Sequence, residues 1–412
     1  MKFCDITMAY NESSGGIRTY IHEKRRYLLD HTEHEHLLIV PGETDRVERC
    51  GRSKIVYLAG PLLPNQDAYR FFVRPDRIRE VLLAHRPDVV ELGSYYLEPW
   101  AVFAYRDRLR EAGENCLVGC YFHTDVAEAY VAAPLRSLAH DWFEDWSETL
   151  ASLGEKLAVL AGSGAERYIR SVFAPCDLAI APSQAQAERL RGYGIENVEI
   201  VPLGVDLELF HPRRRDEAVR AGQGASAESC VLIYAGRLSA EKRVFTLVET
   251  LKRLPASAKA RLWITGHGPL AEALAKASKA LPALRLLPYE RDRTAFASLL
   301  ASADVYLTAG PHETFALSVI EAQACGLPVV GVTAGALRDR VPDGLGFLGP
   351  VDDTAAMAEH ILRAYASRNE IGLKARQHVE ANFGWDSTFR RLLSCYAARS
   401  ANGHATIASA QG

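Results

Sequence analysis

The chain has 412 residues, which at about 150 residues per domain predicts two or three domains. This length excludes a peptide hormone, a small toxin or an isolated binding module. The 48 Lys and Arg residues are balanced by 51 Asp and Glu residues, giving a formal net charge of -3. No overall positive field would therefore hold nucleic acid, and we expect no nucleic-acid partner.

The beginning of the chain and its cysteines carry no sign of export or of a metal centre. Residues 1–16 contain no apolar segment followed by a small-residue cleavage site, so we expect no signal peptide. The longest weakly polar stretch, 157–165, is too short to cross a bilayer. The eight cysteines form no CxxC pair, so we expect reduced thiols, a cytoplasmic location and no metal site.

Short β-rich runs alternate with amphipathic stretches along the whole chain, which predicts parallel sheets covered by helices. In the first half the predicted strands are 2–8, 36–40, 54–58, 88–92, 116–122, 177–181 and 198–201. In the second half they are 230–235, 261–265, 284–287, 305–308 and 328–332. Amphipathic segments such as 77–85 and 243–254 are the predicted helices. The pattern therefore predicts an α/β protein with two doubly wound halves.

Two segments lack apolar periodicity. Residues 205–228 contain three consecutive arginines and a run rich in Gly and Ala, which predicts an exposed connection between domains. We assign residues 1–205 to an amino-terminal domain and 206–384 to a carboxyl-terminal domain. Residues 398–412 are small and polar, so we expect a disordered tail.

Two glutamates follow the predicted strand 305–308. Glu313 precedes a helix predicted at 315–325, and Glu321 lies within that helix. Eight residues of helix span about 12 Å, too far for a pair of hydrolytic carboxylates. The two side chains suit opposite ends of a long ligand such as a nucleoside-diphosphate sugar, whose diphosphate would lie at the helix end. The alternative is that both are solvated helix residues.

Other polar residues also follow predicted strands, where ligands of doubly wound sheets bind. After strand 231–235 the loop carries Arg237 and Lys242, which suit a diphosphate. Gly15 and Gly16 follow the first strand and would let the backbone approach a phosphate closely. His123 follows strand 116–122. Each of these features taken alone is also typical of surface loops, tight turns or a structural histidine.

Together these motifs resemble retaining glycosyltransferases of family 4, which have the two-domain GT-B fold. The matching motifs occur in family order over nearly the whole chain: GGI at 15–17, YFHTD at 121–125, VPLGVD at 201–206, YAGRL at 234–238, GHGP at 266–269, and Glu313-x7-Glu321 followed by ACGLPVV at 324–330. The resemblance implies two Rossmann-like domains facing a central cleft. It also implies that a helix at about 385–397 crosses back onto the amino-terminal domain.

The resemblance implies a role for each matching residue. Arg237 and Lys242 would neutralise the diphosphate, Glu321 would bind the ribose, Glu313 would orient the donor sugar, and His123 would lie near the reacting carbon. His123, Arg237, Lys242 and Glu313 are thus the expected catalytic residues. The remaining expected donor-binding residues are Gly15, Gly16, Gly236, Pro288, Tyr289, Thr314, Phe315, Ala316 and Leu317. Asp125 is expected on the acceptor side.

The family's front-face mechanism needs no protein nucleophile, because the departing phosphate takes the acceptor's proton and the configuration is retained. The sequence has no Asp-x-Asp triplet, so we expect neither a metal nor another cofactor. The donor is expected to be GDP-mannose or a UDP-hexose. The motif at 310–317 is similar to that of mannosyltransferases.

The acceptor is expected to be a glycolipid or another lipid-linked hydroxyl, since the HTD motif at 123–125 is similar to that of lipid-modifying relatives. Basic residues on predicted helices favour contact with an anionic membrane, and so a peripheral position on its cytoplasmic face. These residues are Lys24, Arg25, Arg26, Arg70, Arg74, Arg77 and Arg79. A soluble sugar or polyol acceptor, a non-catalytic nucleotide-sugar-binding subunit and, more remotely, a phosphorylase remain the alternatives.

Overall fold

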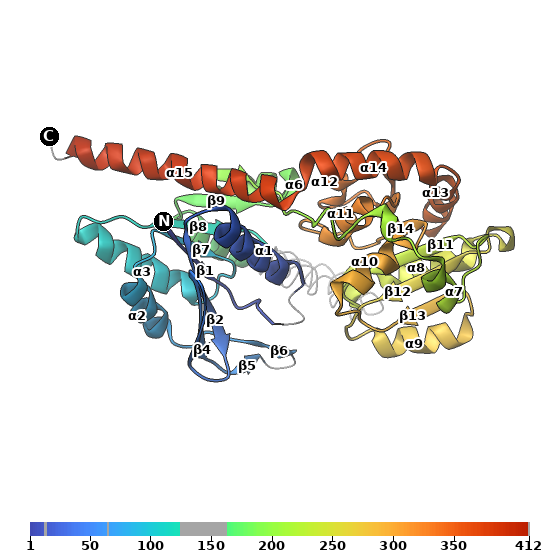
Figure 1. The fold of residues 1–412 in the computed structure, drawn as a ribbon, viewed down its shortest axis with the longest axis horizontal. Helices are drawn as coiled ribbons and strands as arrows, with labels where there is room; N and C mark the ends of the chain where they lie inside the picture. Colours follow the sequence, from blue (N-terminus) through green and yellow to red (C-terminus); the bar gives the residue numbers. More distant parts are fainter. Residues whose placement is uncertain (12–14, 64–65, 124–162, 411–412) are drawn as a thin grey trace, which may run out of the picture. The chain divides into compact units, whose positions relative to one another are not determined.

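The computed structural model describes residues 1–11, 15–63, 66–123 and 163–410 (Figure 1). The chain divides into two compact units. Unit 1 comprises Met1–Pro202 and Thr388–Gly412, and unit 2 comprises Leu203–Ser387. Each unit is an α/β structure built on a mainly parallel sheet, as the strand and helix pattern predicts. The expected cleft between two domains stays a prediction.

Unit 1 is built on an eight-stranded sheet with the order β10-β9-β8-β7-β1-β2-β4-β3. Its strands are buried, except the antiparallel edge strand β3, whose polar sequence gave no strand signal. The bounds are β1 (Lys2–Ile6), β2 (Glu35–Gly42), β3 (Arg46–Cys50), β4 (Ser53–Ala59), β7 (Val89–Leu92), β8 (Leu117–Tyr121), β9 (Leu178–Ala181) and β10 (Val198–Ile200). A separate hairpin joins β5 (Leu62–Leu63) and β6 (Gln66–Arg70).

The helices of unit 1 cover both faces of this sheet. Because parallel crossovers are right-handed, the helix that leads from β1 to β2 lies on the face opposite to those that lead to β7 and β8. On the first face Phe389 of the carboxyl-terminal helix packs against Tyr20 and Tyr27. The helices are α1 (Gly15–His31), α2 (Pro75–His85), α3 (Glu98–Glu111), residues 163–173, α6 (Gln184–Gly192) and α15 (Trp385–Ala410).

Unit 2 is built on a six-stranded parallel sheet with the order β13-β12-β11-β14-β15-β16. The strands are β11 (Val231–Ala235), β12 (Arg261–Thr265), β13 (Leu284–Leu287), β14 (Val305–Leu307), β15 (Val329–Val332) and β16 (Gly346–Gly349). The helices are α7 (Glu217–Gly222), α8 (Val244–Arg253), α9 (Ala271–Ala280), α10 (Arg293–Ala301), α11 (Leu317–Ala324), α12 (Leu337–Arg340), α13 (Thr354–Ala366) and α14 (Arg368–Asn382).

The segment predicted to be an exposed connection is instead part of unit 2. Phe210 is fully buried, and Arg220 on α7 is 1% exposed. The Arg220 guanidinium donates to the carbonyl oxygen of Ser302 (2.9 Å) and to the carboxylate of Asp304 (3.1 Å). Most of the segment is exposed or partly exposed, and the prediction misses its buried anchors, because a buried arginine that is paired and hydrogen-bonded leaves no apolar periodicity in the sequence.

The tail predicted to be disordered continues the last helix. α15 runs from Trp385 through Ala410, so the helix expected at 385–397 is present but longer. Four alanines between 397 and 405 explain the extension, because Ala has the highest helix propensity. Figure 1 shows α15 running along unit 1 past β9. The Arg399 guanidinium of this helix donates to the carbonyl oxygen of Asp177, which directly precedes β9, at 2.8 Å.

In each sheet, successive strands of the chain are added first on one side of the first strand and then on the other. The point where the side changes is where we look for the candidate sites. In unit 1 this point lies between β1 and β7, and in unit 2 it lies between β11 and β14. Ligands of doubly wound sheets bind beyond the carboxyl ends of the strands at this switch point. The loop with Arg237 and Lys242 follows β11, and the loop with Glu313 follows β14. Topology therefore brings these two loops of unit 2 to one place.

Candidate functional site

The loop after β11 is held in shape by tyrosines beneath it and by a glycine loop beside it. The Tyr234 hydroxyl donates to the Arg237 carbonyl oxygen at 2.8 Å, and the Leu238 N–H donates to the His267 carbonyl oxygen at 2.9 Å. A Cβ atom at Gly266, whose φ is +154°, would lie 1.8 Å from the Gly236 carbonyl oxygen. Glycine is therefore required at 266 for the two loops to pack.

Lys242 and Glu313 form an ion pair that joins the loops after β11 and β14. The Lys242 Nζ atom lies 2.7 Å from Glu313 Oε1, and both side chains are partly exposed. The Ala336 N–H donates to the Glu313 carbonyl oxygen at 2.8 Å, which holds the second loop against the segment before α12. An ammonium has three N–H donors, so Lys242 can contact an anion without releasing Glu313.

The backbone before α11 adopts a strained conformation that leaves its amides without an acceptor in the described part of the chain. Ala316 has φ +63° and ψ +56°, the left-handed region that non-glycine residues avoid. Within the described part of the chain, the N–H groups of Phe315, Ala316 and Leu317 meet no hydrogen-bond acceptor. Together with the helix dipole, these amides form a place for an anion. The observed helix begins at Leu317 rather than at the predicted 315.

A buried arginine supports this turn from below. Arg340 is 4% exposed, its Nε donates to the Phe315 carbonyl oxygen at 3.2 Å, and its guanidinium lies 4.2 Å from the centre of the Phe315 ring. The Tyr306 hydroxyl donates to the Ala235 carbonyl oxygen (3.0 Å) and lies 2.7 Å from Ser318 Oγ, which links α11 to the end of β11. These contacts fix the strained turn relative to Arg237 and Lys242.

Glu321 is buried in α11, and its carboxylate pairs with Arg293 at the start of α10. The Arg293 Nη2 to Glu321 Oε1 distance is 2.6 Å, and the Arg293 guanidinium also packs over the Phe210 ring at 4.9 Å. The Glu321 side chain is 5% exposed and that of Arg293 is 46% exposed. The predicted residue Glu321 is thus oriented by an arginine that the sequence motifs did not single out.

Pro288 and Tyr289, predicted to lie near a base, follow β13 and are exposed. The Pro288 carbonyl oxygen accepts a hydrogen bond from the Thr265 hydroxyl at 2.9 Å, and the Tyr289 ring meets the His267 ring edge-on at 5.0 Å. The strip therefore borders the same glycine loop that packs on Gly236. Direct contacts therefore join this segment to the loop after β12, and Lys242 to Glu313, while a common donor site for all these residues stays a prediction.

The predicted residues of unit 1 lie at the carboxyl edge of its sheet. Gly15 and Gly16 begin α1, and a Cβ atom at Gly15 would meet no atom of the described residues within 4 Å. His123 follows β8, and its ring stacks on Tyr121 at 4.2 Å and meets the edge of Tyr20 at 5.3 Å. Burial lowers the pKa of His123 to about 3, so the imidazole is neutral at physiological pH.

A buried charge cluster lies beneath this edge of the sheet. It contains a lysine that the sequence analysis placed on the surface. Lys24, predicted to be part of a basic surface, is 1% exposed, and its Nζ lies 2.8 Å from Asp5 Oδ1 and 3.1 Å from Glu91 Oε1. Burial pushes the pKa of Asp5 upward, but Lys24 and His36 outweigh it and hold that pKa below its usual range. Lys24 therefore stabilises the core and is unavailable to a membrane.

The hydroxyls of two tyrosines complete this buried charge cluster. Tyr20 donates to Glu91 Oε1 at 2.7 Å, and Tyr396 of α15 donates to Glu91 Oε2 at 2.8 Å. Because Tyr20 also touches His123, the cluster and the candidate site share one side chain. The returning helix is thus anchored within the core of unit 1.

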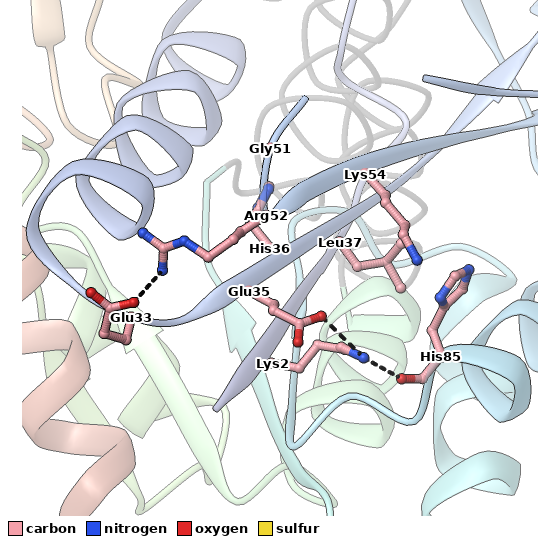
Figure 2. Close-up of a pocket in the computed structure, with 9 residues that line it drawn as sticks. All are labelled: Lys2, Glu33, Glu35, His36, Leu37, Gly51, Arg52, Lys54 and His85. Carbon is pink, nitrogen blue, oxygen red and sulfur yellow. Dashed lines mark hydrogen bonds and ion pairs between the residues drawn. The ribbon is translucent and has the colours of Figure 1, made fainter. Parts of the chain in front are cut away.

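Unit 1 also has a hollow of about 290 Å³ that is separate from the candidate site (Figure 2). It lies at the amino-terminal ends of β1, β2 and β4, which is the sheet edge opposite to the expected ligand edge. Figure 2 shows Lys2 between Glu35 and the His85 carbonyl oxygen. Arg52 donates to carbonyl oxygens at the end of α1, including that of Leu29 at 2.7 Å. These charges cap and join elements, so we assign the hollow no ligand.

Some predictions fall outside what the structure tests. Asp125 lies outside the described residues. Among the residues that are described, no three His, Cys, Asp or Glu side chains gather so as to hold a metal ion. Within the same residues, no helix combines the length and hydropathy needed to cross a bilayer.

The structure adds two residues that sequence reasoning missed, Arg293 and Arg340. Arg293 lies in a loop-to-helix junction with alternating charges, and Arg340 lies in a short helix of ordinary polar sequence. No local pattern distinguishes either from a surface arginine, because each meets its partner from a distant part of the chain.

Two family models match the chain. One is described as Glycosyltransferase Family 4 and matches residues 14–209, and the other is described as Glycosyl transferases group 1 and matches residues 229–367. A GDP-mannose-dependent alpha-(1-6)-phosphatidylinositol dimannoside mannosyltransferase of Mycobacterium tuberculosis is 32% identical over 409 residues, covering 96% of this chain and 95% of that protein. A GDP-mannose-dependent alpha-mannosyltransferase of Corynebacterium glutamicum is 29% identical, covering 90% and 83%.

Solved structures also resemble the whole chain. Sucrose-phosphate synthase from Thermosynechococcus elongatus has a TM-score of 0.75 at 19% identity, covering 98% of this chain and all of that one. Anabaena HepE in complex with UDP-glucose has a TM-score of 0.69 at 16% identity, covering 97% and 100%. At such identities these likenesses establish the fold.

Proposed function

Because this chain belongs to glycosyltransferase family 4 and is a glycosyltransferase with the GT-B fold, we propose that it transfers mannose from GDP-mannose to a hydroxyl group of a lipid-linked acceptor. The anomeric configuration is retained, and no metal ion takes part. The observation that carries the proposal is the assembly of Lys242, Glu313 and the amides before α11 at the switch point of unit 2.

Unit 2 has the groups needed to stabilise a departing diphosphate. Negative charge grows on the β-phosphate as the bond to the sugar breaks. Lys242 and Arg237 supply two cations, and the amides of residues 315–317 supply a helix end, all fixed before the reaction begins. The Tyr234 and Arg340 contacts hold these groups in place, so little reorganisation accompanies bond breaking.

The two glutamates serve the two ends of the donor. Glu321 accepts hydrogen bonds from the ribose hydroxyls, and the ion pair with Arg293 holds the Glu321 carboxylate in a fixed orientation. Glu313 accepts hydrogen bonds from hydroxyls of the mannosyl group while its ion pair holds Lys242 at the diphosphate. The spacing of eight residues thus matches the length of a nucleotide sugar rather than a single bond.

Unit 1 contributes a neutral imidazole. His123 donates one hydrogen bond to the donor sugar and carries no charge that would repel the developing positive character of the reacting carbon. In this mechanism the acceptor hydroxyl attacks from the face that the diphosphate leaves, and a phosphate oxygen takes its proton. Gly15 and Gly16 leave room at the end of α1 for the diphosphate.

The relatives support the choice of donor and acceptor. Both mannosyltransferases described above are named as GDP-mannose-dependent, and the relative from M. tuberculosis is named for a phosphatidylinositol dimannoside. We extend these two properties to the present chain, together with a peripheral position at the cytoplasmic face of the membrane that contains the acceptor.

A thermal-shift panel with GDP, UDP and ADP, each with and without EDTA, tests the donor. We expect GDP to raise the melting temperature most, because a ligand that binds only the folded state stabilises it, and we expect EDTA to leave the shift unchanged. Transfer of radiolabelled mannose from GDP-mannose to phosphatidylinositol dimannoside should follow. A shift with UDP alone contradicts the donor, and GDP binding without any transfer indicates a non-catalytic subunit.

Replacing Arg293 with glutamine is expected to raise the KM for GDP-mannose about tenfold while changing kcat little. The substitution removes a charge-assisted hydrogen bond of about 1.5–3 kcal/mol to Glu321, and about 1.4 kcal/mol corresponds to a factor of ten. Steady-state kinetics with varied donor measures both constants.

Two further variants give this experiment its controls. Arg293→Lys keeps the charge and should recover part of the donor affinity, whereas Arg253→Gln, an exposed residue at the end of α8, should leave both constants unchanged. Equal losses in kcat and in donor affinity for Arg293→Gln would argue for general disruption of unit 2 rather than for positioning of Glu321.

A further inference from the structure

Five large apolar or aromatic side chains gather on one surface of unit 1. We call this surface the aromatic platform, and it consists of Phe71, Tyr96, Leu97, Trp100 and Tyr168. Leu97 is 46% exposed and Trp100 is 45% exposed, at the start of α3. A single exposed residue of this kind is ordinary, but a cluster of them on one surface marks an interaction site.

The platform is rigid, because direct contacts join its members. The Phe71 and Tyr96 rings meet edge to face at 5.9 Å, and the Tyr168 hydroxyl donates to the Tyr96 carbonyl oxygen at 2.5 Å. The Trp100 ring meets the buried Phe103 ring edge-on at 5.9 Å, which fixes it to the core of unit 1. These side chains come from three separate parts of the sequence, which explains why no local motif predicted the surface.

A buried glutamate fixes the exposed turn to the sheet. Glu98 is fully buried, and its Oε2 accepts a hydrogen bond from the Leu97 N–H at 2.9 Å. Its other oxygen accepts from the Ser94 hydroxyl, whose oxygen accepts from the Met8 N–H at 2.9 Å. The turn that presents Leu97 is therefore tied to the end of β1, which places the platform at the same carboxyl edge as Gly15 and His123.

The charges around the platform favour an anionic partner. Arg70 adjoins Phe71, and Arg167 adjoins Tyr168. No ion pair joins either arginine to an acidic residue in the parts of the chain that the structure describes. Three other arginines of the basic set that the sequence suggested, Arg26, Arg74 and Arg77, are paired with Glu23, Asp76 and Asp45. Arg70 and Arg167 thus supply positive charge beside the aromatic residues.

We propose that the aromatic platform docks unit 1 on the interfacial layer of a bilayer that contains anionic lipid. Trp and Tyr suit this layer because each has an apolar ring and a polar group, Leu97 reaches the acyl boundary, and the two arginines contact lipid phosphates. The inference rests on the proposed function, since a lipid-linked acceptor presents its hydroxyl at that layer. Docking there brings the acceptor to the edge that carries His123.

Vesicle sedimentation of the full chain tests this docking, with vesicles of phosphatidylcholine alone and of phosphatidylcholine mixed equally with phosphatidylglycerol. We expect the double variant Leu97→Ser, Trp100→Ser to lower the partition coefficient about tenfold, because it removes two large apolar side chains that are each nearly half exposed. Arg167→Gln should weaken binding only to the vesicles that contain phosphatidylglycerol. Leu373→Ser removes a still more exposed leucine from unit 2 and should change nothing.

Two further measurements separate this inference from the proposed function. The thermal shift caused by GDP should be the same in the wild type and the double variant. Mannosyl transfer to acceptor in vesicles should fall in the double variant, and transfer to the deacylated, water-soluble acceptor should not. Unchanged vesicle binding by the double variant, no vesicle binding by the wild type, or a dimer that the double variant dissociates would each overturn the docking proposal while leaving GDP binding intact.

Discussion

Replacing Lys242 with methionine is expected to lower kcat/KM for transfer from GDP-mannose by about 10²–10³-fold. Methionine keeps most of the length and apolar volume of the lysine but removes the positive charge placed for the leaving diphosphate. Loss of one such preorganised group from an active site typically has an effect of this size. Glu313 then loses its partner at 2.7 Å, so the donor sugar is held less well too. Steady-state assays of product formation measure the change.

The matched control for this variant is Lys252→Met on α8. Lys252 is about half exposed and pairs only with Glu249 at 2.6 Å on the same helix. A surface pair of this kind is worth little, so kinetics and stability should both stay close to wild type. If Lys242→Met retained kcat/KM within a few-fold of wild type, the assignment of the diphosphate to this loop would be wrong.

Replacing Lys24 with methionine is expected to destabilise unit 1 by about 3–5 kcal/mol. Lys24 is the cation that lies between Asp5 and Glu91, and its removal leaves buried carboxylates without a counter-charge. For a unit of this size the loss corresponds to a fall of about 10 °C in melting temperature. Differential scanning calorimetry measures it, and the transition of unit 2 should stay unchanged.

A second substitution tests whether charge is the cause. Adding Glu91→Gln to Lys24→Met removes one of the uncompensated carboxylates and should recover part of the lost stability. Arg26→Met, on the same helix but exposed and paired only with Glu23, should cost less than about 1 kcal/mol. Equal destabilisation by Lys24→Met and Arg26→Met would show that the buried cluster contributes nothing special.

The fold was largely predictable because its signal is local. Apolar runs such as Val231–Ala235 and Val329–Val332 are strands buried on both faces, and helices separate them. The elements that escaped prediction have sequences without that signal. β3 is fully exposed and charged, and β16 is bounded by two glycines. Both are edge strands. Fewer side chains are buried there, so fewer positions in the sequence need to be apolar.

The candidate site was predictable where its residues follow strands directly. Arg237, Lys242 and Glu313 were singled out because the carboxyl ends of parallel strands meet at one edge, and the structure pairs Lys242 with Glu313. Their roles in binding a donor stay predictions. The residues that orient them were not found, because Arg293 reaches Glu321 across a sequence separation of 28 residues. These orienting residues matter because of contacts with residues far away in the sequence. Such contacts produce no fixed spacing that a sequence motif could show.

The clearest error of the sequence reasoning was the placing of Lys24 on a basic surface, whereas contact of the other basic residues with a membrane stays a prediction. Lys24 in the run 24–26 resembles a membrane-facing cation, yet the helix turns it into the core between two carboxylates. Helical spacing alone does not say that Asp5 and Glu91 lie on the strands below. The sequence is equally silent on the aromatic platform, whose residues are distributed between positions 71 and 168.

The return of α15 to unit 1 has a consequence for how the protein is made. Unit 1 needs residues from both ends of the chain, whereas unit 2 is continuous. During synthesis, unit 2 can fold before the residues that complete unit 1 have left the ribosome. Until then Glu91 lacks the Tyr396 hydroxyl, and the space above Gly119 that Tyr396 fills stands open. Completion of the amino-terminal unit is therefore a late event that follows synthesis of α15.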